Sequence, residues 1–363
     1  MKFLKRFFNT PEIPIQNYQE FWNWFSENEK KFFTIVKDRN NIQKLFFDIL
    51  SDKLDQLHVG YFFACGMFDK NTAELIISAE GNIKNIIFVE ELVATAPPLK
   101  KWRFTALKPQ NNLNDINIQM GGFEFSPSKV SFISTINHNF PDEIAITLLH
   151  DDYSENNKQT ISNGLFVFLE HYLGELKSAT MIDEIRFENP KNITDDIIPI
   201  HKLNDYLIWR EKEFIEKYDA VRHGTENDQY AILEAKLQSG NPLIAVINTD
   251  LLKWNAKASH SWILWIEIIF DKKPTSNEIY DEKYIILNQF EDDLLAQLKD
   301  FDGYLNLGRQ TYEGKREIFF ACKDFRKPAK IIPYMAQKYQ HQLDITFDIF
   351  KDKYWTVMQQ FAN

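Results

Sequence analysis

Two strand-length segments in the last third of the chain carry apolar side chains at odd and even positions alike. They are residues 261–270, SWILWIEIIF, and residues 315–323, KREIFFACK. Successive side chains of a strand point to opposite faces of a sheet, so each of these strands buries both of its faces. This pattern fits only central strands of a sheet that is covered on both sides. The rest of the C-terminal fold has to supply that cover.

These two strands are the first and third of a regular series. The apolar spacing predicts, in order, strand 261–270, helix 278–300, strand 303–311, strand 315–323, helix 326–340 and strand 343–350. This β-α-β-β-α-β order is that of a ferredoxin-like sandwich, with the first and third strands central and the other two at the edges. The two helices cover one face. We expect the other face to be covered by the hairpin at 229–249, by the N-terminal half or by a second copy of the chain.

The remaining chain predicts a second domain. Helical and alternating patterns over residues 1–187 predict an N-terminal mixed α+β domain with an antiparallel sheet, whose first helix buries Phe21, Trp22 and Phe25. Turn-forming residues and a further helical pattern predict a linker with a bridging helix over 188–225. The C-terminal domain then takes residues 226–363. The expected fold class is α+β with two domains.

Composition restricts the compartment and the partners. The chain has no run of about 18 apolar residues and no apolar stretch after the basic N-terminal residues, so we expect neither a membrane span nor a signal peptide. Two distant cysteines, Cys65 and Cys322, form no disulfide framework and fit a reducing cytoplasm. The formal net charge of -10 is spread over both halves, which disfavours nucleic acid as a partner.

The motifs of common catalytic and cofactor sites are absent. The sequence contains no G-x-x-x-x-G-K-[ST], G-x-G-x-x-G, H-E-x-x-H, G-x-S-x-G or C-x-x-C. We therefore expect no cofactor and no metal, and we assign no catalytic residue. His223, Glu226 and Asp228 lie in a polar loop that gives a metal no rigid geometry. In Ser259-His260, adjacent residues of a strand would point to opposite faces, so we expect no Ser–His hydrogen bond.

One charged cluster is predicted at an end of the C-terminal sheet. Glu291 borders the buried stripe of its helix. Arg309 is expected at the end of its strand on the face that carries Leu305, and Lys315 and Arg316 follow across a turn. The spacing predicts an ion pair of Glu291 with Arg309 or Arg316. A second interpretation makes all four charged residues a ligand-binding or catalytic anion site.

Several short motifs in the C-terminal part resemble a known family. They are Glu291-Asp292-Asp293-Leu294, Leu307-Gly308-Arg309 with Thr311, Gly314-Lys315-Arg316-Glu317 and Asp352-Lys353-Tyr354-Trp355. Over residues 225–361 the chain resembles a bacterial family of domains of unknown function, number 695 in its series. The resemblance implies no established activity. Some members of that family are fused to a domain similar to a ribonuclease E regulator, which implies a regulatory or adaptor context for those members; residues 1–185 do not resemble that regulator.

These observations favour a function without catalysis. We expect a cytoplasmic bacterial protein that binds or regulates a protein, either another chain or a second copy of itself. The alternative is an enzyme or a small-anion-binding protein that uses the charged cluster. A pocket with a free Glu291 carboxylate would favour this alternative, and a closed ion pair would count against it. Trp265 and Phe319 are expected in the core, whereas RNA binding would need both rings exposed.

Overall fold

The computed structural model of this chain describes residues 14–270 and 277–361. The chain forms two compact units. The first contains the residues up to Glu80 and Phe88–Lys108, and the second contains Gly81–Ile87 and the residues from Pro109 onward. Helices and strands are mixed in both units, which confirms the α+β class. The second unit runs across residues 188–225, and a domain boundary there remains a prediction. No helix of the described residues is both long and apolar enough to cross a membrane.

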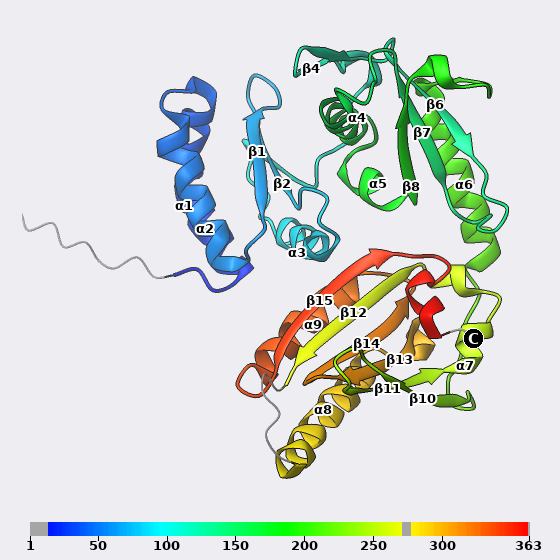
Figure 1. Cartoon of the computed structure of the whole chain (residues 1–363). Helices are drawn as coiled ribbons and strands as arrows, with labels where there is room; N and C mark the ends of the chain where they lie inside the picture. The colour runs from blue at the N-terminus through cyan, green and yellow to red at the C-terminus, as the bar shows by residue number, and fades with distance from the viewer. Residues whose placement is uncertain (1–13, 271–276, 362–363) are drawn as a thin grey trace, which may run out of the picture. The chain divides into compact units, whose positions relative to one another are not determined.

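The first unit packs helices against a small sheet (Figure 1). Its elements are α1 (Tyr18–Asp38), α2 (Asp48–Leu57), β1 (Phe62–Met67), β2 (Ala73–Ser78), the second half of α3 (Ile83–Ala94) and β3 (Trp102–Ala106). Aromatic side chains of α1 fill the core. Phe21, Trp22 and Phe25 are buried as predicted, and the ring of Phe25 meets that of Trp102 edge to face with centroids 4.9 Å apart.

The middle of the chain forms a four-stranded sheet in the second unit, ordered β8-β7-β6-β9. Its elements are β4 (Ile118–Met120), β5 (Phe123–Phe125), β6 (Val130–Thr135), β7 (Ala145–His150), α4 (Lys158–Leu173), α5 (Glu175–Thr180), β8 (Glu184–Glu188), β9 (Ile198–Pro199) and α6 (Leu203–Tyr218). Every residue of β7 is buried. Side chains of α4 and α6, among them Phe168 and Leu207, join those of the sheet in one core.

The N-terminal sheets are antiparallel only in part, which corrects the expectation for residues 1–187. β2 pairs with β3 in parallel, and β7 pairs with β8 in parallel. In both cases helices connect the two strands, namely α3 in the first pair and α4 with α5 in the second. A helical crossover lets neighbouring strands run in the same direction. Alternating apolar residues mark a strand but do not give its direction.

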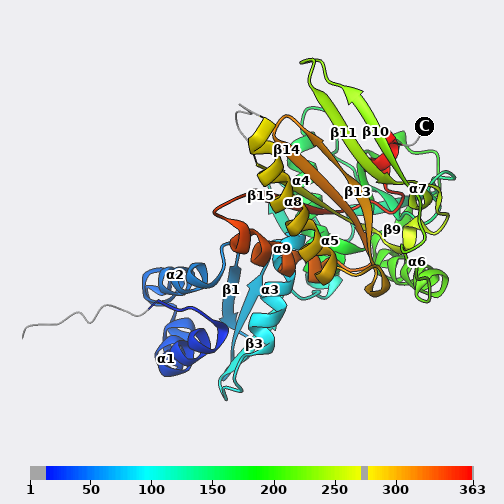
Figure 2. The ribbon, with the colours of Figure 1, turned by 90° about the horizontal axis from the view of Figure 1, so that it is seen from below.

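The C-terminal part of the second unit is an antiparallel sheet ordered β10-β11-β13-β14-β12-β15 (Figure 1). Its elements are β10 (Tyr230–Lys236), β11 (Pro242–Asn248), α7 (Thr249–Lys253), β12 (Trp262–Ile269), α8 (Asn277–Gln297), β13 (Tyr304–Tyr312), β14 (Lys315–Cys322), α9 (Arg326–Tyr339) and β15 (Asp344–Lys351). From β12 onward the elements follow the predicted order, and β12 and β14 are central. Figure 2 shows α8 and α9 against one face of this sheet.

The hairpin β10–β11 extends this sheet instead of lying over its second face. β11 pairs with β13, so the prediction that residues 303–311 form an edge strand is wrong. Edge pairing depends on backbone hydrogen bonds, which the side-chain pattern does not encode. Gly308 permits the close approach of the two strands. Its φ is +136°, and a Cβ at this position would lie 2.4 Å from the carbonyl oxygen of Val246.

The chain itself covers the second face of the C-terminal sheet. Side chains of the sheet, of α7 and of the 3₁₀ segment Thr356–Phe361 form one core, whose buried members are Ala245, Ile247, Leu251, Ile263, Leu305, Leu307, Phe319, Ala321, Trp355 and Met358. Trp265 packs at the margin of this core. The sequence predicted the hairpin, the N-terminal half or a second copy as this cover. α7 and the 3₁₀ segment, which lack a strong apolar period, were not among these alternatives, and the hairpin contributes Ala245 and Ile247 to the same core.

A substitution in α4 tests the packing of the middle core. Gly164 lies on a helix, where alanine normally stabilises by about 1 kcal/mol. A Cβ at Gly164, however, would lie 2.0 Å from Cζ of the buried Phe125. We expect Gly164→Ala to lower the free energy of unfolding by about 1–3 kcal/mol in urea denaturation. Gly66→Ala is the control, since no atom lies within 4 Å of its Cβ position. Equal or greater stability of Gly164→Ala would contradict this packing.

Candidate functional site

Three of the four predicted cluster residues meet between α8 and the sheet. Glu291 on α8 is 6% exposed, and its Oε1 accepts a hydrogen bond from Nη1 of Arg309 at 2.6 Å. Its Oε2 lies 3.5 Å from Nη1 of Arg316. Arg316 is also buried, and it donates to Asn288 and Thr311. The carboxylate is therefore saturated by two arginines, which is the closed ion pair rather than the open pocket.

A bulge in β13 brings Arg309 to α8. The register between β13 and β14 shifts between Asn306 and Gly308, so one extra residue interrupts the alternation. Leu305 belongs to the core on the second face, whereas Arg309 reaches Glu291 on the helical face. The expectation that Arg309 and Leu305 share a face is therefore wrong, although the predicted ion pair is present.

Lys315 lies apart from this ion pair. Its Nζ is 2.6 Å from Oε2 of Glu267, beside a second pair in which Gln310 donates to Glu317. Glu317 is 8% exposed. Neighbouring residues of a strand point to opposite faces, so Lys315 and Arg316 separate onto the two sides of the sheet. Three of the four predicted residues therefore meet in one ion-pair cluster, whereas Lys315 binds Glu267 on the other side of the sheet.

The histidines singled out in the sequence have structural partners. Nε2 of His223 lies 2.9 Å from Oδ2 of Asp228, which also accepts from Asn248. Glu226 is exposed and takes no part in this contact. Among the described residues, no group of three or more His, Cys, Asp or Glu side chains has the arrangement of a metal site.

Ser259 and His260 do form a hydrogen bond, contrary to expectation. Oγ of Ser259 lies 2.8 Å from Nδ1 of His260, because Ser259 ends a 3₁₀ turn and not a strand. Ser259 also donates to the carbonyl of Ala256 at 2.6 Å. Its one proton is therefore engaged, and Nδ1 of His260 is the donor in the Ser–His contact. Burial lowers the pKa of His260 to about 3, so this ring remains neutral near pH 7.

A second polar cluster, which we call the Lys353 cluster, joins β15 to the middle of the chain. Nζ of Lys353 lies 2.8 Å from Oδ2 of Asp183 and 2.6 Å from the carbonyl oxygen of Asp142. Lys351 binds the other carboxylate oxygen of Asp183, also at 2.8 Å. Lys353 is 4% exposed. Burial, with the nearby Lys351 charge, lowers the pKa of Lys353 to about 8.

Tyr354 and Asp142 complete the Lys353 cluster. The hydroxyl of Tyr354 donates to Oδ2 of Asp142 and accepts from its backbone N–H. Asp142 also accepts from Lys217 and Tyr218 on α6. Burial of Asp142 would raise its pKa, but these hydrogen bonds outweigh it and lower the pKa. The only sequence signal for this cluster is the Asp352–Trp355 motif, because its acidic partners lie more than a hundred residues earlier.

A groove along α6 is the other feature that the sequence analysis missed. This α6 groove has a volume of about 500 Å³ and is lined by Ser134, Ile136, Pro141, Asp142, Tyr206, Trp209, Arg210, Glu213, Phe214 and Lys217. Trp209 is 54% exposed and Ile136 is 66% exposed. Arg210 donates to the carbonyls of Pro141 and Glu143, and Lys217 pairs with Asp142 at 2.7 Å. The charged groups are thus held by the protein, and the accessible surface is aromatic and aliphatic.

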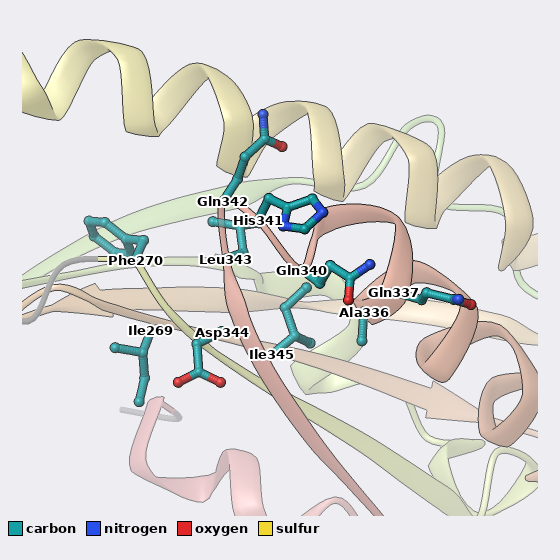
Figure 3. A pocket seen from close by; sticks show the side chains of 10 residues that line it. All are labelled: Ile269, Phe270, Ala336, Gln337, Gln340, His341, Gln342, Leu343, Asp344 and Ile345. Atoms are coloured by element: carbon teal, nitrogen blue, oxygen red, sulfur yellow. The ribbon is translucent and has the colours of Figure 1, made fainter. Parts of the chain in front are cut away.

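Another hollow lies at the C-terminal end of α9 (Figure 3). It has a volume of about 570 Å³, and its polar lining comprises Gln337, Gln340, His341, Gln342 and Asp344. Figure 3 shows these side chains spread along the hollow instead of meeting at one point. One wall ends at Phe270, next to residues 271–276, which lie outside the described residues. This geometry assigns no ligand.

The pKa of Lys353 predicts a pH dependence of stability. In the unfolded chain the lysine pKa is about 10.4. Between about pH 8 and 10 the unfolded state therefore binds more protons than the folded state, and stability rises with pH. We therefore expect the free energy of unfolding of the wild type to rise relative to that of Lys353→Met between about pH 8 and 10. The expected change is at most about 1.4 kcal/mol per pH unit. Urea denaturation at each pH measures it, with the exposed Lys212→Met as control. A constant difference would contradict the burial of a charged Lys353.

Comparisons with known proteins identified no relative of this chain. No protein-family model, no curated protein and no solved structure matches the chain.

Proposed function

We propose that this chain is a non-catalytic protein-binding module, and that the α6 groove is its docking surface. The observation behind the proposal is the half-exposed indole of Trp209 beside Tyr206 and Arg210 in a groove of about 500 Å³. Tryptophan, tyrosine and arginine dominate the binding energy of protein interfaces when they lie in a pocket. An exposed aromatic groove of this kind is typical of a surface that is covered in a complex.

The charges in the groove define the partner's chemistry. Arg210 and Lys217 already have acceptors within the protein, and Asp142 has three donors. A partner that brought a charged side chain would have to break one of these contacts, at a cost in free energy. The groove therefore favours a protein segment that inserts aliphatic or aromatic side chains against Trp209 and Ile136.

The alternative, an enzyme or small-anion-binding protein at the end of the C-terminal sheet, has weaker support. Glu291 is saturated by Arg309 and Arg316, and Lys315 binds Glu267 on the other face. An incoming anion would have to displace the Glu291 carboxylate from two arginines. The burial of Phe319 gives no support to RNA stacking either.

We also propose that the C-terminal part is a ferredoxin-like sandwich extended by the hairpin β10–β11. The support is the chain order β-α-β-β-α-β together with the strand order β13-β14-β12-β15, which places the first and third strands of the series at the centre. The resemblance of residues 225–361 to the bacterial family, and the two separate cysteines, support a bacterial and cytoplasmic protein.

Site-specific cross-linking tests the docking surface. A photoreactive phenylalanine analogue at position 209 is expected to give an adduct with one protein in the source cells, identified by mass spectrometry. Tyr334, which is 62% exposed on α9 outside the groove, is the control position. An adduct with a second copy of this chain would make the protein its own partner. The same adducts from both positions, or none from position 209, would overturn the proposal.

The affinity of the identified partner gives a quantitative prediction. We expect Trp209→Ala to weaken binding by about tenfold or more, as truncation of an interface hot spot does. Tyr334→Ala should change the affinity by less than about twofold, since exposed residues outside an interface contribute little. Titration calorimetry measures both. Similar affinities for the two variants would contradict a role of the α6 groove.

A further inference from the structure

A small cavity in the second unit has four cationic side chains among its thirteen lining residues. It has a volume of about 220 Å³ and lies among the start of β12, the ends of β14 and β15, the first turn of α9 and one side of α6. Its charged lining residues are Lys323, Arg326, Lys351, Lys353, Glu211 and Asp324. We call it the Lys323 cavity. It shares no residue with the Glu291 ion pair.

Most of these charges have a partner within the protein. Asp183 binds both Lys351 and Lys353, and Arg326 lies 3.0 Å from Oδ2 of Asp324. Lys323 differs from them. Among the described residues its ammonium pairs with no carboxylate, and it donates only to the carbonyl oxygen of Asp219 at 3.3 Å. The cavity therefore contains one cation whose charge is not neutralised by a direct partner.

Charges of both signs act on Lys323, namely the Arg222 guanidinium and, in the opposite sense, the Asp219 carboxylate. Arg222 donates to the carbonyls of Asp219 and Val221, and no carboxylate of the described residues binds it. Burial and the Arg222 charge both lower the pKa of Lys323. The N-terminus of α9, a fourteen-residue helix that begins at Arg326, adds the positive end of its dipole. The Arg222 charge and the helix dipole favour an anion beside Lys323.

We propose that the Lys323 cavity binds a small phosphate group, either inorganic phosphate or the phosphate of a monoester. Lys323 would supply the unneutralised charge, and Arg326 and Ser261 are among the residues that line the site. A volume of about 220 Å³ suits a small anion, since pockets for larger organic ligands start at about 300 Å³. This proposal does not depend on the α6 groove.

Phosphate titration of the full chain tests the site. Titration calorimetry with inorganic phosphate in a buffer of low chloride concentration is expected to show one binding event that weakens as ionic strength rises. Lys323→Gln should weaken it by about tenfold or more, because a charge-assisted contact is lost. Lys323→Arg should retain binding, which separates loss of charge from loss of folding. Lys327→Gln is the matched control, since Lys327 pairs with Asp302 and does not line the cavity.

The titrations distinguish free phosphate from a phosphate monoester as the ligand, and two results would overturn the proposal. Glycerol 1-phosphate that binds more tightly than inorganic phosphate would support a monoester ligand, and equal binding would support free phosphate. Absence of binding to the wild-type chain would overturn the proposal. Equal weakening by Lys323→Gln and Lys327→Gln would also overturn it, because the effect would then be general surface electrostatics.

Discussion

Closure of the second face of the C-terminal sheet is the constraint on which this part of the molecule depends. β12 and β14 are apolar on both sides, so the sheet needs two covers, and α8 and α9 supply only one. The second cover begins at the four residues Asp352–Trp355. Oδ2 of Asp352 accepts from Thr356 and from the N–H of Val357, which fixes the start of the 3₁₀ segment, and Trp355 fills the core below it. Between Asp352 and Trp355 in the sequence, Lys353 binds Asp183 and Tyr354 binds Asp142. One short turn thus seals the sheet and ties it to the middle of the chain.

The fold was predictable from the sequence wherever a local period decides it. Side-chain alternation and helical spacing identified β12, α8, β13, β14, α9 and β15, because each element buries a continuous apolar stripe. The errors concern choices that side chains do not encode. Strand direction in the pair β2–β3 follows from a crossover, and the pairing of β11 with β13 follows from free backbone groups. The bulge at Leu307 inserts one residue and reverses the faces that follow it.

The candidate sites were likewise predictable only where a local sequence pattern marks the residues. The contact between Glu291 and Arg309 was predictable only as one of two alternative ion pairs, because the sequence analysis did not foresee the bulge in β13 that moves Arg309 to the helical face. The Lys353 cluster was not, because Lys353 and Asp183 are 170 residues apart and neither lies in a pattern that points to the other. Trp209 gave no signal either, since an exposed and a buried tryptophan on a helix look alike in a sequence. The hydrogen bond of Ser259 to His260 required a 3₁₀ turn where the sequence predicted a strand.

The late position of Trp355 also bears on how the chain folds during synthesis. Its indole binds the carbonyl of His260, 95 residues earlier, so the second face of β12 stays bare while those residues are made. At a translation rate of roughly 5–20 residues per second, this interval lasts about 5–20 seconds. An uncovered apolar sheet is prone to aggregation over such times. A chaperone that shields nascent strands would therefore act on the C-terminal sheet during this interval.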